Sequence, residues 1–365
     1  MAEVSTNASA NPPTDPPATP PTSAESPSAA PTEAPTTLAD IEVDEGALTD
    51  DASTIDDRIS SYTASLTSSA VDYPEEYGRR YHAFREGSYQ YPNDEREMDR
   101  LDFNHALVLK TIGKPFLAPI EEDKVHHVLD IGTGTGIWAM EMGDQFPNAE
   151  VIGFDLSAIQ PEWVPPNVKF EIDDAESDWI RETQFDFIFA RYLAFSIADW
   201  PKLVRNIHAN LNPGGWAEFQ DYDLLFESDD GTLTEKHETQ RWDKLACEIG
   251  DKIGRTGRPG PKLYDWVKEA GFKNIVYHHY KIPVGPWAKD KYYKDIGMLN
   301  LIQLLDGLEA FTLKPFCGVL GWTTEEAQVL LANVRSELKT GAFHAHMSFY
   351  VVYGQKVEEE NEGNE

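Results

Sequence analysis

The feature that most constrains the fold is a glycine-rich turn between an apolar run and a helix-forming segment. Residues 128–131 are mostly apolar or β-branched and predict a short buried parallel strand. Gly132, Gly134 and Gly136 follow at alternate positions. Glycine tolerates positive φ and has no Cβ, so the backbone can turn sharply there and a ligand can approach it closely. Residues 137–142 predict a helix whose free N–H groups point back at the turn and favour a negatively charged ligand group.

Two nucleotide-type patterns fit this turn. Gly134, Gly136 and Ala139 match the G-x-G-x-x-A pattern of dinucleotide-binding folds. Asp130, followed by the three glycines, matches the D-x-G-x-G-x-G loop of S-adenosylmethionine-dependent methyltransferases. A carboxylate at the strand end suits the ammonium group of that cofactor and repels a pyrophosphate. The turn therefore favours S-adenosylmethionine, with a dinucleotide and a purely structural turn as alternatives.

Composition excludes several other classes. The 365 residues include 63 acids and 31 Lys and Arg, a net charge of −32, so phosphates of nucleic acids and anionic membranes would repel the chain. The longest basic run is Arg79-Arg80, so direct nucleic-acid binding is not expected. Cys247 and Cys317 make neither a disulfide framework nor a metal site, which indicates an intracellular protein of the cytoplasm or nucleus. Neither a signal peptide nor an apolar run long enough to span a bilayer is evident.

The chain divides into four predicted segments. Residues 1–57 are rich in Pro, Ser, Thr and Ala and predict a disordered tail. Residues 58–120 predict an N-terminal segment, in which an aromatic and basic stretch at 73–91 is either a lid or a helix packed on the core, before a helix that ends near Gly113. Residues 121–355 predict the main α/β domain, with a helical insert at about 285–340 that either covers the acceptor or only packs on the core. Residues 356–365 predict an acidic tail.

Polar residues follow the predicted strands where each one ends. Asp155 is placed to bind ribose hydroxyls, Asp174 lies in an acidic loop that can accept a hydrogen bond from adenine, and Arg191 also falls at a strand end, where ligands bind in such sheets. The alternative for both acids is a solvated turn. Alternating strands and helices predict a doubly wound α/β sheet, with strands at 128–131, 149–155, 168–172, 185–190, 216–219, 274–280 and 343–353.

Longer motifs resemble one family. The stretches 128–138, 151–168, 170–176 and 211–216, with 78–87, 305–309 and 350–354, are similar to the LaeA-like fungal methyltransferases. The resemblance covers roughly residues 58–355. It implies the seven-stranded class I methyltransferase fold with an antiparallel last strand, and S-adenosyl-L-methionine as cofactor. It also implies that Gly132, Gly134 and Gly136 carry the methionine end, Asp155 the ribose and Asp174 the adenine.

The resemblance leaves the methyl acceptor open. The family acts in fungal secondary metabolism, some members as regulators with velvet-type protein partners and others beside biosynthetic enzymes. The acceptor is therefore a small molecule or a protein, and a cofactor-binding scaffold with little turnover is a further alternative. A base is needed only if the acceptor must lose a proton. None is assigned, and the candidates are Tyr192, Asp221, Tyr222, His344 and His346. No metal-ligand spacing is present.

Overall fold

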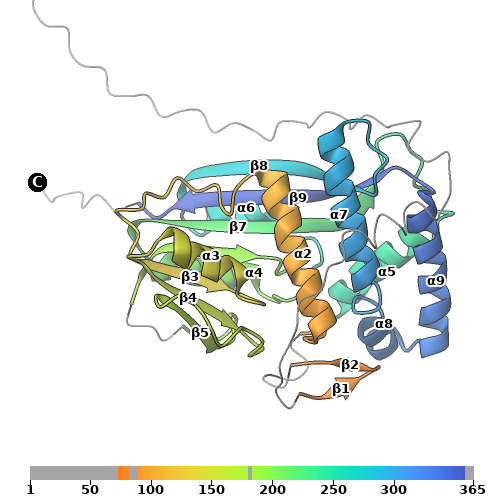
Figure 1. Cartoon of the computed structure of the whole chain (residues 1–365), viewed down its shortest axis with the longest axis horizontal. Coiled ribbons are helices and arrows are strands. Elements are labelled where there is room, and N and C mark those ends of the chain that lie inside the picture. Colours follow the sequence, from red (N-terminus) through yellow and green to blue (C-terminus); the bar gives the residue numbers. More distant parts are fainter. Residues whose placement is uncertain (1–72, 83–84, 86–88, 180–182, 358–365) are drawn as a thin grey trace, which may run out of the picture. The chain divides into compact units, whose positions relative to one another are not determined.

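The computed structural model describes residues 73–82, 85, 89–179 and 183–357. The predicted tail at 1–57 and most of the acidic tail therefore lie outside the described residues. The helices and strands, labelled as in Figure 1, are β1 (Glu75–Glu76), β2 (Arg79–Arg80), α2 (Glu95–Ile112), β3 (His127–Ile131), α3 (Ile137–Gln145), β4 (Glu150–Asp155), β5 (Val168–Ile172), β6 (Phe185–Arg191), α4 (Trp200–Asn210), β7 (Leu211–Glu227), α5 (Glu238–Lys252), the 3-10 turn η1 (Gly260–Lys262), α6 (Leu263–Glu269), β8 (Lys273–Val284), α7 (Lys291–Gly307), α8 (Leu313–Leu320), α9 (Thr324–Thr340) and β9 (Ala345–Gln355).

The large sheet has seven strands in the order β5-β4-β3-β6-β7-β9-β8. The pairs from β5 to β7 are parallel, whereas β9 runs antiparallel between β7 and β8. The chain order reverses at β3, where β4 lies on one side and β6 on the other. In open α/β sheets a ligand binds outside the carboxyl ends of the strands at such a switch point. The predicted doubly wound fold with an antiparallel last strand is confirmed.

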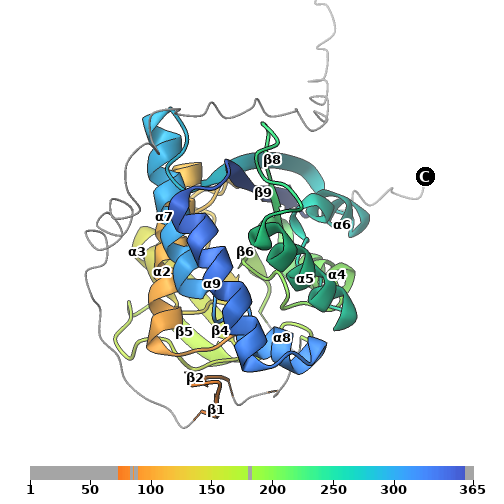
Figure 2. The same cartoon turned by 90° about the vertical axis from the view of Figure 1, so that its right-hand side faces the viewer.

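Side chains of the central strands alternate between two faces, and each face is covered by helices (Figure 2). Val128 and Phe187 pack with Trp138 and Met142 of α3 on one face. On the other, β-strand side chains pack against α4 and α6. The apolar runs are thus explained by burial on both sides, as in other parallel sheets.

A third apolar cluster joins α2, α5, α7, α8 and α9 to the far ends of β7, β8 and β9. Helix α7 lies beside α2, and α9 lies on the other side of α7 and also contacts α5 (Figures 1 and 2). The predicted helical insert is present, and its capping box is formed by Thr323 and Glu326 at the start of α9. None of the helices in the described part of the chain is long and apolar enough to cross a membrane.

Several elements differ from the expectations. The described residues before α2 form a short β1–β2 hairpin, not a helix. Strand β7 extends to Glu227, because it pairs with β9 well beyond Phe219. Asp221 and Tyr222 therefore lie inside a strand and not after it. Helix α5 was not predicted, although Trp242 and Ile249 of its buried side have helical spacing.

Candidate active site

The glycine turn has the geometry that the sequence predicted. Gly132, Gly134 and Gly136 have φ values of 66°, 57° and 80°, and Gly136 caps the amino end of α3. A Cβ added to Gly132 would lie 2.7 Å from Leu193 Cδ2, and one added to Gly136 would overlap the ring of Phe170. A Cβ added to Gly134 would lie 3.5 Å from its nearest neighbour, an ordinary contact. This position is therefore constrained by its positive φ and by any ligand that approaches the backbone from the cleft.

The turn forms one wall of a cleft of about 1150 Å³, counting its open mouth. The cleft lies at the carboxyl ends of β3, β4, β5 and β6, and residues 89, 92 and 93 close it from the N-terminal segment. Asn93 donates a hydrogen bond to Ser157 Oγ (3.3 Å), and the amide of Ala158 donates to the Tyr73 hydroxyl (3.0 Å). The stretch predicted as either a lid or a packed helix thus contacts the loop after β4. Six of the seven residues predicted to bind cofactor line this cleft: Asp130, Gly132, Gly134, Asp155, Asp174 and Arg191. Gly136 does not line it, although its neighbours Thr135 and Ile137 do.

Asp130 is a buried carboxyl at the base of the cleft. Its Oδ2 accepts a hydrogen bond from the Thr133 hydroxyl at 2.6 Å. Burial raises its pKa to about 7, against the opposing effects of Thr133 and of the positive charge of Arg191. A cation placed beside this carboxyl would favour its ionised form, so the site suits an ammonium group.

Asp155, at the end of β4, holds the turn as well as facing the cleft. Its Oδ2 accepts the amide of Gly134 at 2.9 Å, and its Oδ1 accepts the amide of Ser157 at 3.0 Å. Burial raises its pKa, and these backbone donors oppose the rise. Even with a third backbone donor, Leu156, the carboxylate keeps an acceptor position, which a ribose hydroxyl requires.

Asp174 lies in the loop after β5. Its Oδ1 accepts the amide of Glu176 at 2.9 Å, and Oδ2 lies 3.5 Å from Nε of Arg85. The acidic loop is therefore ordered by its own backbone and by an ion pair from the N-terminal segment. It lines the same cleft as Asp130, which is consistent with the predicted adenine-binding role.

Arg191 is held by a residue that the sequence did not predict for the site. Its Nη2 donates to Nδ1 of His105 at 2.7 Å, and His105 Nε2 lies 3.0 Å from Glu141 Oε2. Burial, and then the charge of Arg191, lower the pKa of His105 to about 3, so the ring is neutral. Nη1 of Arg191 is buried and has no hydrogen-bond partner among the described residues. This orphaned donor fits the carboxylate of the methionine end.

A second cavity adjoins the cleft and shares Tyr89, Leu101 and Tyr192 with it. Tyr192 has a φ of 58° and stacks on Tyr222, with ring centroids 5.5 Å apart. Phe195, which also lines the second cavity, has a φ of 60°. Positive φ at a bulky residue is strained and clusters at functional sites. The strained segment after β6 therefore forms the partition between the two spaces.

Three of the five catalytic candidates line the second cavity: Tyr192, Asp221 and Tyr222. Asp221 accepts the amide of Leu193 at 2.8 Å and so fixes the strained segment, and burial raises its pKa to about 7. Burial also raises the pKa of Tyr192 and Tyr222, which makes both phenols poorer proton acceptors at neutral pH.

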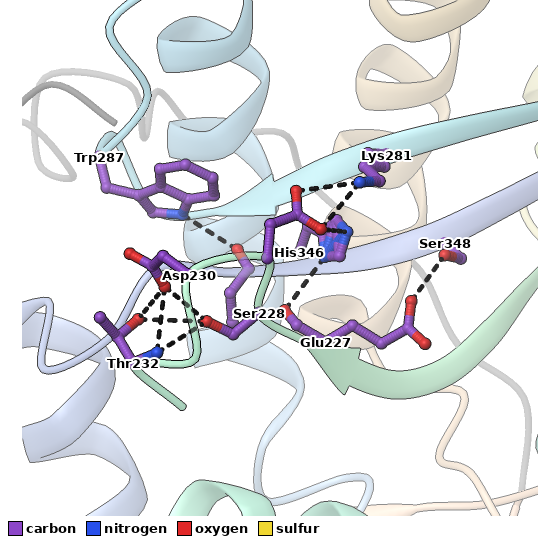
Figure 3. Close-up of polar contacts among 10 residues, drawn as sticks. Glu227, Ser228, Asp230, Thr232, Lys281, Trp287, His346 and Ser348 are labelled. Carbon is purple, nitrogen blue, oxygen red and sulfur yellow. Dashed lines mark hydrogen bonds and ion pairs between the residues drawn. The ribbon is translucent and has the colours of Figure 1, made fainter. Parts of the chain in front are cut away.

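The two histidine candidates line neither cavity. His346 Nδ1 contacts the Glu227 carbonyl at 3.0 Å, and Figure 3 shows the ring in a polar cluster with Lys281. His344 Nδ1 lies 2.6 Å from Asp230 Oδ2 in the neighbouring loop. These contacts account for both rings structurally, so the geometry argues against a catalytic role. No group of three or more metal-binding side chains occurs among the residues that the structure describes.

The fold and cleft define a class I methyltransferase, and the comparisons with known proteins agree. Residues 104–277 match the family described as a methyltransferase domain. Methyltransferase pytC of Aspergillus terreus is 47% identical over 81% of this chain and 92% of its own. Secondary metabolism regulator LAE1 of Cochliobolus heterostrophus is 35% identical over 76% and 92%, respectively. Among solved structures, Haemonchus contortus phosphoethanolamine N-methyltransferase 2 with S-adenosyl-L-methionine has a TM-score of 0.39, at 19% identity, covering 70% of this chain and 53% of that one.

The chain belongs to the LaeA-like family of S-adenosylmethionine-dependent methyltransferases. The cofactor is S-adenosyl-L-methionine, and the dinucleotide alternative is excluded. A methyl acceptor is implied by this class, and the relatives are connected with secondary metabolism.

Proposed function

We propose that the protein methylates a small molecule of secondary metabolism that enters through the second cavity. The observation that carries the proposal is the shared wall: Tyr89, Leu101 and Tyr192 face both the cofactor cleft and a separate space lined mainly by apolar and aromatic side chains. A pocket of this kind, with few polar groups, is typical of small-molecule sites.

Bound S-adenosylmethionine supplies a methyl group on an activated sulfonium. In the proposed site, Asp130 takes the ammonium, Arg191 the carboxylate, Asp155 the ribose and Asp174 the adenine, while the three glycines let the backbone approach. The chain's main contribution is then to hold the acceptor in line with the methyl group and to exclude water. If the acceptor must lose a proton, Asp221 lines the second cavity and its pKa of about 7 suits a base at neutral pH.

A second function has support from the relatives. Several of them carry the name of secondary metabolism regulators, at about a third identity over most of the chain. Under this alternative the acceptor is a protein, or a velvet-type partner binds the protein in the nucleus and turnover matters little. The two functions also differ in compartment, since a tailoring enzyme can act in the cytoplasm.

Complementation of a gene deletion separates these cases. A tailoring enzyme predicts intact transcripts of the biosynthetic genes and accumulation of one unmethylated metabolite. A regulator predicts lower transcripts of whole gene clusters. Asp155→Ala is the test variant and Asp155→Asn its milder partner, because asparagine retains one oxygen for the amide of Gly134. Full rescue by a variant that binds no cofactor would reject methyl transfer as the function.

A further inference from the structure

The wall of the second cavity contains a bulge in the middle of strand β7. Asp223 pairs with Ser348 of β9, but the next pair joins Phe226 to Met347, so two extra residues stand opposite one step of the partner strand. One of them, Leu224, lines the cavity together with Phe226. Bulges re-aim side chains and are common beside active sites.

This bulge is held on three sides. Arg258 donates two hydrogen bonds to the Asp223 carboxylate, both at 2.7 Å. The amide of Leu224 donates to the Gly257 carbonyl at 3.3 Å. The amide of Phe226 donates to Oδ2 of Asp243, on helix α5, at 2.8 Å. The structure thus fixes the far wall of the cavity, and Asp243 is part of that wall.

Only one hydrogen bond to the Asp243 carboxyl is formed within the described part of the chain, and it engages one of the two oxygens. The side chain is buried, and the charged or titratable groups that face it are Asp223 of β7, Arg258 of the following loop, and Lys244 and Cys247 of α5. Burial raises its pKa to about 8, with Asp223 adding to the rise and Arg258 and Lys244 opposing it. At neutral pH the group is therefore mostly a neutral acid that can donate a hydrogen bond.

Aromatic rings supply most of the remaining wall. Tyr91 meets Phe195 and Phe311 edge to face, with centroids 6.3 and 5.4 Å away, and Phe226 lies 6.2 Å from Trp242. Directly before the bulge, Tyr222 stacks on Tyr192, which also lines the cofactor cleft. Interlocked rings of this kind favour a planar, apolar guest.

The cavity also disfavours a charged guest. Its only described arginine, Arg100, is already paired with both oxygens of Glu97, at 2.7 and 3.0 Å. An anion would meet Asp221 and Asp243 without a free cation to offset them. A cation gains its full stabilisation only beside an ionised carboxylate, and Asp243, with a pKa of about 8, is mostly neutral at pH 7.

We propose that the second cavity binds a planar, uncharged aromatic acceptor, and that Asp243 hydrogen-bonds the end of that molecule remote from the transferred methyl group. Tyr222 and Phe226 are separated by two steps of the partner strand, about 7 Å, so the acceptor spans roughly the length of two fused rings. The inference rests on the proposed function, because it names the acceptor class of that same site. Asp243 acts here as a specificity-determining residue.

Equilibrium binding of defined probes tests this assignment. Full-length protein saturated with S-adenosylhomocysteine is titrated with 2,6-dihydroxynaphthalene, with naphthalene and with naphthalene-2-sulfonate. We expect the dihydroxy probe to bind most tightly and the sulfonate at least tenfold more weakly. Asp243→Ala should weaken the dihydroxy probe about tenfold and naphthalene little, which corresponds to about one lost hydrogen bond. Asp243→Asn should retain the probe, because the amide keeps both a donor and an acceptor for Phe226.

Asp251→Ala, on the exposed side of the same helix, is the matched control and should change nothing. The affinity of each variant for S-adenosylhomocysteine reports whether its fold is intact. If Asp243→Ala does not fold, the comparison of wild type with Asp243→Asn still tests the proposal. Raising the pH from 7 to 8.5 should change the affinity of wild type for the dihydroxy probe more than that of Asp243→Asn, because only the carboxyl titrates in this range. Equal binding of all three probes, or equal loss of naphthalene and the dihydroxy probe in Asp243→Ala, would overturn the inference.

The proposed function fails by a different result. If labelled methyl groups reach a small molecule while the aromatic probes do not bind, only the acceptor class and the role of Asp243 are wrong. If the probes bind but no small molecule is methylated, the cavity assignment stands and the tailoring function is wrong. A lysine-containing peptide that competes with the dihydroxy probe for the cavity would contradict both.

Discussion

The Arg191 guanidinium donates from Nη2 to the neutral His105 ring at 2.7 Å, and the other side of that ring contacts Glu141. This contact joins helix α2, before the sheet, to the carboxyl end of β6. It leaves Nη1 of Arg191 as a buried donor at the cofactor cleft. A histidine far from the glycine turn thus positions the group proposed to hold the cofactor's carboxylate.

His105→Ala should therefore weaken S-adenosylmethionine binding about tenfold, the effect of losing the orientation of one charge-assisted hydrogen bond. Decarboxylated S-adenosylmethionine should bind wild type and variant with similar affinity, because it lacks the group that Arg191 takes. Calorimetric titration of both ligands gives the ratio. An equal loss of affinity for both ligands would indicate that His105 only supports packing. Glu141→Gln should weaken S-adenosylmethionine binding less than His105→Ala does, because Glu141 is the partly exposed end of this chain of contacts.

Cofactor affinity should rise with pH between 6 and 8. The Asp130 carboxyl, with a pKa of about 7, is protonated below this value and ionised above it, and an ammonium group binds the ionised form more tightly. The dissociation constant should fall about tenfold from pH 6 to pH 8 and then level off, and binding near pH 7 should release protons. Asp130→Asn should bind weakly with little pH dependence. Equal wild-type affinity at both pH values would remove Asp130 from the ammonium site.

Gly134→Ala should reduce cofactor affinity by far more than it reduces stability. The φ of 57° costs roughly 1–2 kcal/mol for a residue with a Cβ, but that atom would meet only ordinary contacts within the protein. Gly321→Ala is the matched control, since its φ of 72° imposes similar strain in open space after α8. The melting temperatures of the two variants should fall by similar amounts. Unchanged cofactor affinity in Gly134→Ala would show that the ligand does not approach this backbone.

Buried carboxyls should make the protein less stable at pH 8 than at pH 6. Glu218 is fully buried, and burial raises its pKa from 4.5 to about 7, so the folded state binds the proton more tightly than the unfolded state. Glu218 contributes fully to the free energy of unfolding below pH 4.5, and this contribution is lost as the pH rises through 7. The free energy of unfolding falls by at most about 1.4 kcal/mol per pH unit over this range. Glu218→Gln should reduce this pH dependence by the contribution of one carboxyl, and exposed Glu162→Gln should leave it unchanged. Denaturant unfolding at the two pH values measures the difference, and a wild type more stable at pH 8 would contradict the account.

Local patterns were enough for the parallel half of the sheet. The glycine turn, the apolar runs of β3, β4 and β6, and Asp155 and Asp174 all lie within short stretches whose periodicity and turn residues specify their structure. Their convergence on one cleft follows from the rule that parallel strands end at the same edge. The capping box of α9 is equally local.

The second cavity could not be predicted in this way, because residues from distant parts of the chain form it. Asp243 reaches Phe226 from α5, and Arg100 reaches Gln303 across 203 residues. The bulge in β7 is held by Arg258, and no local sequence pattern predicts that this arginine contacts Asp223. The surroundings of the two histidine candidates were equally out of reach of local patterns. His346 lies in β9, where it pairs with Glu227 and Pro283 away from both cavities, and His344 contacts Asp230 from the loop before that strand.

The most direct test of the central claim is where the methyl group goes. Purified full-length protein is incubated with methyl-labelled S-adenosylmethionine and a whole-cell extract of the deletion strain, and small molecules and proteins are separated before label is counted. The account predicts label on one small aromatic metabolite with wild type, and none with Gly134→Val. Label found on protein alone, with no small molecule gaining a methyl group, would contradict it.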